Sequence, residues 1–444
     1  MYILLIFLLI ILLIISILEF DGEILAPPVA MLLMFIFAAL LGLIKWNDWR
    51  LYEYSGVSVF LLLSGIVFFT LSSFFVRTVV FGGIKYKGKS IPVYSPRIEL
   101  GSIPLFCFLI LGLATNIVLY LTMKRIVGHL GFSTNSISAI INHFRNITTL
   151  EVFAGQYDVP SYVKMLIWIT TSIGIFCLFV FFHSVVFKVF RKRDILLILV
   201  ALLWLTAMLL NSHRSYVLTA LGISIYLIFF FLNMHYGWQP FVNRKILKLG
   251  LRLFILLLIG FIGLAVLLGR FKSIQDINIS NYLANYISSG VRNFDFFIND
   301  PPETKSYGFE TFASLFRSIN NQFGLGHFVP TELEFTYING NVITNIYTAF
   351  RRYYSDFGYW GLIIISSFMG GAFTYLYEGI KKRGREGIFD FRLLVFLYFC
   401  KGIFQMCIEE TILDFEISLN GLFKIIVLYL LYYVFIKKKV RVTL

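Results

Sequence analysis

Apolar runs of about 20 residues recur from one end of this chain to the other, and they constrain its fold more than any other feature. A run of this length matches the hydrocarbon thickness of a bilayer. Inside a bilayer every backbone N–H and C=O group must be bonded internally, so each run is expected to form an α-helix. The chain is therefore predicted to be an all-α polytopic membrane protein.

The composition agrees with this class, because 59% of the residues are hydrophobic and only 14% are charged. We predict about 11 transmembrane helices, with ends uncertain by a few residues. They cover residues 2–18, 24–44, 55–75, 104–122, 162–187, 195–211, 215–233, 251–269, 359–378, 390–408 and 417–436. No basic segment precedes the first run and no small-residue cleavage pattern follows it, so it is expected to be a retained span rather than a signal peptide.

The spans divide the chain into three regions within a single membrane domain. Residues 1–269 form a bundle of about eight spans, and residues 359–444 form about three spans and a tail. Between them lies the loop 270–358, which is far longer than a connection requires. Short helices are predicted in this loop around residues 310–322 and 343–357.

Basic residues gather in alternate connections, which sets the predicted sidedness. The clusters are 77–103, 188–194, 243–248, 381–385 and 437–441. By the positive-inside rule these segments and the C-terminus are cytoplasmic, so the long loop 270–358 and the turn 409–416 are extracytoplasmic. This topology also accounts for the net charge of +14 without a nucleic-acid partner.

Two kinds of cofactor site are not expected. The segment Gly83–Ser90, GIKYKGKS, matches the phosphate-loop pattern, but a membrane span precedes it and a proline follows, whereas the pattern needs a strand and a helix N-terminus. It is interpreted as a basic cytoplasmic loop. The chain has no H-E-x-x-H motif and no paired His/Asp spacing, so neither a metal nor another cofactor is predicted.

Three cations stand where charge is unusual. Arg214, in the turn NSHRS, lies on the predicted outer side, where it is either a snorkelling surface residue or an anion clamp. Lys401 and Lys424 lie inside spans, about two helical turns from the turn 409–416. Ionisable groups at such positions are functional candidates, although the acids of that turn could hold them in structural ion pairs.

The stretch TNIYTAFRRYYSDFGYWG leads from the long loop into the ninth span. On a helix Tyr347, Arg351 and Tyr354 share one face, while Arg352 and Asp356 form an i, i+4 pair on another. Arg351 is then expected to be unpaired between aromatic rings. A guanidinium in this setting suits a sugar–phosphate group, because it can grip phosphate while the rings stack on the sugar.

At this point the chain resembles the Wzy-type oligosaccharide repeat-unit polymerases of bacterial O-antigen and capsule synthesis. The resemblance rests on the span number with one long loop, on the segment NSHRSYVLTALGISIY, and on NIYTAFRRYYSDFGYWG. It carries over Arg214, Arg351 and Asp356 as site residues. Family members often have a proline beside the motif arginine, and Arg352 occupies that place here, so the choice between Arg351 and Arg352 stays open.

The resemblance implies a metal-independent glycosyltransferase of the bacterial plasma membrane whose active face is extracytoplasmic. Such an enzyme transfers a growing glycan from undecaprenyl diphosphate to a new lipid-linked repeat unit and releases undecaprenyl diphosphate. A flippase and a chain-length regulator are the protein partners that would accompany it, besides membrane lipid.

Outer cations could stabilise the leaving diphosphate, and a side chain must accept the proton of the attacking hydroxyl. The further candidates for binding the diphosphate are Arg270, Arg292, Arg317, Lys401 and Lys424. The candidate bases, among which the sequence does not choose, are Asp356, Glu409, Glu410, His213 and His327.

Three other classes remain open. A ligase of the O-antigen type would share the architecture and differ in the acceptor. A polyprenyl-phosphate-sugar transferase would use Glu19, Asp21 and Glu23 as an outer metal site. A lipid-linked oligosaccharide flippase or other transporter would show pseudo-symmetric halves and short loops, which the long loop does not favour.

Overall fold

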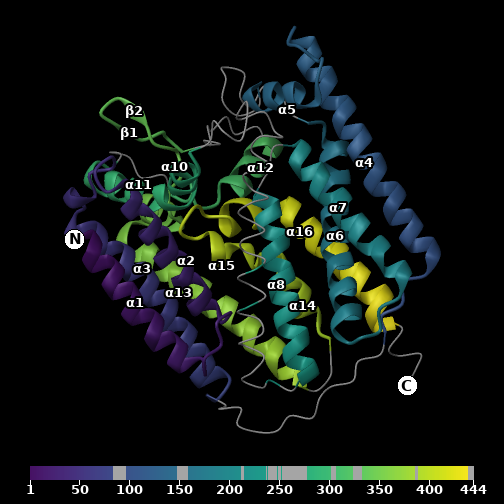
Figure 1. Ribbon diagram of the computed structural model, residues 1–444, viewed down its shortest axis with the longest axis horizontal. Helices are drawn as coiled ribbons and strands as arrows, with labels where there is room; N and C mark the ends of the chain where they lie inside the picture. The colour runs from purple at the N-terminus through teal and green to yellow at the C-terminus, as the bar shows by residue number, and fades with distance from the viewer. Residues whose placement is uncertain are drawn as a thin grey trace. The chain divides into compact units, whose positions relative to one another are not determined.

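The structure is a computed structural model of the 444-residue chain, and the regular secondary structure of its described residues is almost all helical (Figure 1). The residues it describes are 1–83, 97–147, 159–211, 215–236, 278–301, 307–323, 333–385 and 389–438, together with the single residues 238, 248 and 252.

Nine helices within these described ranges, some counted with a short extension, are long and apolar enough to cross a membrane. They are α1 (Tyr2–Glu19), α2 (Pro27–Gly42), α3 (Gly56–Phe75), α4 (Ser102–His129), α6 (Ser161–Val186), α7 (Ile195–Leu210), α8 (Ser215–Tyr236), α13 (Ala349–Arg385) and α16 (Leu419–Tyr432). Each overlaps one of the predicted apolar runs. The class of all-α polytopic membrane protein is therefore confirmed.

Two of the 11 predicted spans are not among these nine helices. The run 251–269 lies outside the described residues, apart from residue 252. The run 390–408 is not one continuous helix but two short ones, α14 (Phe391–Phe399) and α15 (Lys401–Gln405), which are separated at Cys400. The predicted number of 11 helices is therefore not reached in the described part of the chain.

Contacts divide the chain into two compact units that do not follow chain order. Unit 1 comprises Met1–Lys89, Asn278–Arg383 and Phe399–Gly421. Unit 2 comprises Ser90–Ile277, Gly384–Tyr398 and Leu422–Leu444. Each unit therefore combines segments that are far apart in the sequence.

In unit 1, α1, α2 and α3 pack on one another, and α2 also packs on α11 (Ser289–Asn299) and α15. The Tyr2 hydroxyl donates to the Ala39 carbonyl at 3.0 Å, which ties α1 to α2. The helix α13 lies against α3, because the Ser73 hydroxyl donates to the carbonyl of Gly370 at 3.1 Å. Close helix packing of this kind relies on small residues at the contact.

In unit 2, α6 packs on α4, α7 and α8, and α4 also packs on α7. Gly174 in α6 lies directly under Trp204 of α7, since a β-carbon there would come within 2.7 Å of the indole ring. The hydroxyl groups of Thr115 and Thr170 are hydrogen-bonded across the α4–α6 contact at 3.0 Å. A short amphipathic helix, α5 (Ile137–Arg145), packs on α4.

The predicted long loop belongs to unit 1 where it is described. It contains α10 (Ile279–Leu283), the π-helical turn η7 (Ala284–Ser288), α11, α12 (Ala313–Phe323), and the antiparallel strands β1 (Tyr337–Ile338) and β2 (Asn341–Val342). The helix α12 overlaps the segment 310–322, for which a short helix was predicted. The helix predicted at 343–357 instead begins at Ala349, because the hairpin and an extended segment precede it.

The hairpin and the kink of α13 both depend on backbone with positive φ. Asn339 and Gly340, at the hairpin tip, have φ angles of 51° and 77°, as a tight two-residue turn requires. Gly358, inside α13, has φ 66° and ψ −156°, a region that essentially only glycine occupies. The kink at Gly358 separates the first turns of α13 from its long apolar part.

Candidate functional site

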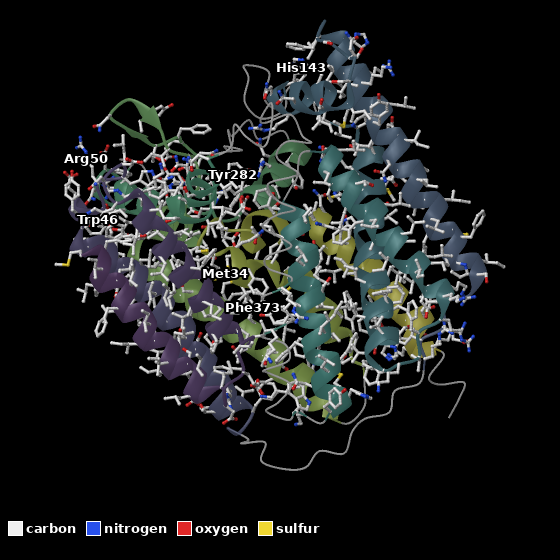
Figure 2. All side chains as sticks on the ribbon, in the orientation of Figure 1. Met34, Trp46, Arg50, His143, Tyr282 and Phe373 are labelled. Atoms are coloured by element: carbon white, nitrogen blue, oxygen red, sulfur yellow. The ribbon has the colours of Figure 1, made fainter. Side chains whose placement is uncertain are left out.

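Charged side chains gather in unit 1 around the first turns of α13. Five further segments contribute to this group: the loop 307–312, α12, the segment 333–336 before β1, α15, and the turn that contains η8 (Ile412–Glu416). We call the residues involved the charge cluster; they are Glu310, Arg317, Glu334, Arg351, Arg352, Asp356, Lys401, Glu409, Glu410, Asp414 and Glu416. In Figure 2, side chains that carry nitrogen and oxygen are dense at the end of unit 1 where Arg50 is labelled.

Arg351 is the centre of the cluster and is only 2% exposed. Its Nη1 lies 2.9 Å from an oxygen of Glu310, and its Nη2 lies 2.8 Å from both carboxylate oxygens of Glu334. The guanidinium carbon also lies 4.5 Å from the ring centroid of Tyr347 and 4.7 Å from that of Phe297. The expected aromatic setting is present, but the expectation that Arg351 is unpaired is wrong.

The two tyrosines expected beside Arg351 have different positions. Tyr347 precedes α13, and its hydroxyl donates to the carboxylate of Glu334 at 3.2 Å. Burial, followed by the charge of Glu334, raises the pKa of Tyr347, which keeps its hydroxyl protonated as a donor. The ring of Tyr354 instead meets the edge of Phe297, so Phe297 supplies the second ring that the sequence assigned to Tyr354.

Arg352 and Asp356 both bind the loop before α12 rather than each other. Arg352 donates to the carbonyl of Glu310 at 2.7 Å, and its Nη2 lies 3.0 Å from Asp414. Asp356 accepts the backbone N–H groups of Glu310 at 3.3 Å and of Thr311 at 2.6 Å. Its carboxylate therefore already stabilises a loop, which weakens its case as a catalytic base.

Asp414 is fully buried and forms ion pairs with two arginines. The Nη2 of Arg352 lies 3.0 Å from one of its oxygens, and the Nη2 of Arg317 on α12 lies 3.5 Å from the other. Burial raises the pKa of Asp414, although both arginines oppose that shift. The side chain of Arg317 remains 28% exposed, more than that of Arg351 or Arg352.

The adjacent acids Glu409 and Glu410 have different roles. Glu410 is buried and accepts the backbone N–H groups of Ile412 at 3.0 Å and Asp414 at 2.6 Å, which shapes the turn. Burial raises its pKa to about 7. Glu409 is half-buried, and within the described part of the chain its carboxylate has no hydrogen bond or ion pair. Burial raises the pKa of Glu409 as well, while the charges of Lys401 and Arg352 oppose this.

The two lysines of the predicted spans fall in different units. Lys401, in unit 1, forms an ion pair with Glu416 at 2.5 Å. For Lys401 the structure therefore shows the ion pair with an acid of the turn 409–416 that was one of the two predicted alternatives. Lys424, in unit 2, lies 5.2 Å from the ring centroid of Tyr398.

Arg292 is bound locally in α11. It forms an ion pair with Asp295 and lies 4.1 Å from the ring centroid of Phe296. Asp295 in turn accepts the backbone N–H of Ser55 at 3.0 Å, next to the start of α3. Arg292 therefore stabilises the attachment of α11 and does not join the charge cluster. The remaining predicted residues, His213, Arg214, Arg270 and His327, lie outside the described residues.

The acids after the first span lie at the other end of α13. Asp21 forms an ion pair with Arg77 at 2.7 Å, and Glu23 forms one with Lys381 at 2.7 Å. The predicted metal site of a polyprenyl-phosphate-sugar transferase would need these carboxylates free. In the ranges that the structure describes, no group of three or more His, Cys, Asp or Glu side chains has the geometry to hold a metal ion.

Glu310, Glu334 and Phe297 are the members of the site that sequence reasoning missed. Glu310 and Glu334 are separated acids in a loop without periodicity, so no local pattern associates them with Arg351. The one available signal was the excess of arginines in the same loop, because buried guanidinium groups require carboxylate partners.

The arrangement can perform two chemical tasks. Arg317 offers a partly exposed cation next to buried arginine–carboxylate pairs, where it could stabilise an anion. Glu409 offers a carboxylate that has no hydrogen bond or ion pair with any described residue, and burial raises its pKa, so it could accept a proton. Comparison of the chain with known protein families, curated proteins and solved structures found no match.

Proposed function

We propose that this protein polymerises undecaprenyl-diphosphate-linked oligosaccharide repeat units at the outer leaflet of the bacterial plasma membrane. One observation carries the proposal: the half-buried carboxylate of Glu409, which no described residue engages, lies within the electrostatic reach of Lys401, Arg352 and Asp414. A transfer reaction on a diphosphate carrier needs this combination of a base and fixed cations. The resemblance to Wzy-type polymerases supplies the substrate class.

In the proposed reaction Glu409 removes the proton from a hydroxyl of the acceptor sugar. The hydroxyl oxygen forms a bond to the anomeric carbon of the donor glycan, and the bond between that carbon and the diphosphate oxygen breaks. The bonding electron pair leaves with undecaprenyl diphosphate, so charge develops on the phosphate oxygens. Arg317, which is 28% exposed, is the most exposed cation of the charge cluster, and we assign it to meet that charge.

The buried pairs around Arg317 support this role by fixing its position. Asp414 holds the guanidinium from one side, while Arg317 also donates to the carbonyl of Ala313 at 3.3 Å within its own helix. A cation held in place before the reaction loses no free energy to reorganisation when charge develops. Arg352 is more deeply buried, and it stabilises the loop before α12 through the carbonyl of Glu310.

The test is a reconstituted reaction. Purified protein in lipid vesicles receives one lipid-linked repeat unit without added metal or nucleotide, and the products are separated on a gel. A ladder of even steps supports the polymerase, whereas recovery of intact substrate from the correct repeat unit contradicts it. Transfer of a finished glycan to a different acceptor in a single step would indicate the ligase instead, and movement of intact substrate into the vesicles would indicate a flippase.

Glu409→Gln tests the assignment of the base. It is expected to lower the rate of ladder formation by about 100-fold or more, because general base catalysis contributes this much. The matched control is Glu53→Gln, which changes an exposed glutamate of the same unit and should leave the rate unchanged. If both variants make the ladder at the wild-type rate, Glu409 is not the base.

A further inference from the structure

Arg351 has two carboxylate partners that differ greatly in exposure. The side chain of Glu310 is 11% exposed, whereas that of Glu334 is 56% exposed. Glu310 is also held by the hydroxyl of Ser355 at 3.1 Å. One partner is therefore a fixed part of the protein interior, and the other reaches Arg351 from the solvent side.

The position filled by the Glu334 carboxylate has the features of an anion site. Nη2 of Arg351 lies 2.8 Å from both oxygens, and the Tyr347 hydroxyl donates to one of them at 3.2 Å. The rings of Tyr347 and Phe297 flank the guanidinium. In addition, Nε of Arg351 is buried and has no hydrogen-bond partner among the described residues, so the arginine retains unused donor capacity.

Glu334 can leave this position without unfolding its surroundings. The hairpin that follows it is held elsewhere, since the Thr336 hydroxyl donates to Asn293 at 2.7 Å and Arg50 donates to Asn339 at 2.6 Å. A rotation of the exposed Glu334 side chain is therefore sufficient. Arg351 would then be a buried cation with only one of its two carboxylate partners, Glu310. An external anion could favourably take the place of the Glu334 carboxylate.

We propose that Arg351 and Tyr347 form a binding site for a phosphate or diphosphate group, and that the Glu334 carboxylate occupies this site as an internal competitor until the ligand displaces it. Glu334 thereby weakens binding of the anion and assists its release. The inference rests on the proposed function only for the identity of the lipid carrier, since the competition itself follows from the contacts of Arg351.

The binding test uses the full-length protein in phosphatidylcholine nanodiscs, with inorganic pyrophosphate as the probe and titration calorimetry at one fixed ionic strength. Glu334→Gln keeps the shape of the side chain and removes its charge. It is expected to bind pyrophosphate about tenfold more tightly than the wild type, because a charge-assisted hydrogen bond no longer has to be exchanged. An affinity equal to or lower than that of the wild type, at an unchanged melting temperature, overturns the proposal.

Two further variants locate the effect. Glu53→Gln, which also removes one exposed negative charge from unit 1, should leave the affinity unchanged. A gain as large as that of Glu334→Gln would show a general charge effect and contradict the proposal. The double variant Arg351→Gln with Glu310→Gln removes the buried cation together with its buried partner, so it avoids leaving an unpaired charge. It should lose pyrophosphate binding, and retained binding would place the anion elsewhere.

The source of the phosphate is distinguished by two additional ligands. The first is phosphatidylglycerol, added to the nanodiscs. If the ligand is a diphosphate, Glu334→Gln should still bind pyrophosphate more tightly than the wild type in these nanodiscs. If phosphatidylglycerol instead competes strongly with pyrophosphate, the site is assigned to a lipid headgroup. Sodium glucuronate offers a carboxylate instead of a phosphate. If it binds more tightly than pyrophosphate, the assigned ligand class is wrong.

The outcome is independent of the polymerase assay. Tighter pyrophosphate binding by Glu334→Gln without any glycan ladder would support the anion site and contradict the proposed function. A glycan ladder together with an unchanged pyrophosphate affinity would support the function and contradict the role of Glu334.

Discussion

The buried carboxylate of Asp414 joins two arginines, and its removal tests whether charge pairing holds the cluster together. Asp414→Asn keeps the side-chain volume and removes the charge that faces Arg352 at 3.0 Å and Arg317 at 3.5 Å. Arg352 is 10% exposed on its side chain, so its charge cannot be solvated when its partner is neutral. Arg317 is 28% exposed and can turn toward water.

The exposures of Arg352 and Arg317 determine how much stability Asp414→Asn is expected to lose. Breaking a buried pair by removing one partner costs about 3–5 kcal/mol, and Arg352 keeps its hydrogen bond to the Glu310 carbonyl, so the lower value of about 3 kcal/mol applies. The pair with Arg317 is partly screened by solvent and adds less than about 1 kcal/mol. We therefore expect Asp414→Asn to lower the free energy of unfolding by about 3 kcal/mol.

The assay is equilibrium unfolding in detergent micelles, followed by tryptophan fluorescence. The double variant Asp414→Asn with Arg352→Gln should recover about 2 kcal/mol of the loss, because it no longer leaves a buried cation unpaired. Asp48→Asn, which removes a 64% exposed carboxylate paired with Lys45, should change stability by less than about 0.5 kcal/mol. A loss for Asp414→Asn as small as that of Asp48→Asn would refute the reasoning.

Three further outcomes are expected. Because Glu409 must be ionised to act as a base and burial raises its pKa, polymerisation should rise with pH through that raised pKa, and Glu409→Gln should abolish this rise in the pH–rate profile. Burial raises the pKa of Glu410 from 4.5 to about 7, so the folded state binds this proton more tightly than the unfolded state. The resulting contribution to the free energy of unfolding should be fully present below pH 4.5 and should fall by about 3 kcal/mol as the pH rises through 7. Unfolding titrations of Glu410→Gln should lack that fall. Gly358→Ala should lower stability by about 1–3 kcal/mol, because φ 66° with ψ −156° strains any other residue although no atom lies within 4 Å of the added β-carbon. Gly56→Ala, where the space is equally open and φ is not positive, should not show this loss in the same thermal unfolding measurement.

Local patterns in the sequence were sufficient for several features of the fold. Nine of the predicted apolar runs are present as long helices in the described part of the chain. The helix α12 (Ala313–Phe323) overlaps the segment 310–322, for which a short helix was predicted. The pair Asn339–Gly340 is a common hairpin signal, and it forms the two-residue turn between β1 and β2.

The internal contacts of the site could not be read in this way. Arg351 was expected to be unpaired, and it is bound by Glu310 and Glu334, which are distant from it in the sequence. The i, i+4 spacing placed Arg352 beside Asp356, but the loop before α12 engages both residues. A pair at this spacing contributes only a few tenths of a kcal/mol, so burial against another segment easily overrides it.

The sequence by itself determined that this chain is an all-α polytopic membrane protein. The length and apolarity of each run are local properties of the sequence, and they are sufficient for the run to form a helix inside a bilayer. It also placed an unusual number of arginines and tyrosines before α13. Only the tertiary structure decided which carboxylates those arginines meet, and that Glu409 is left without a partner among the described residues. The physical reason is that a buried charge must be matched by whichever opposite charge the fold brings near, and that choice depends on the packing of distant segments.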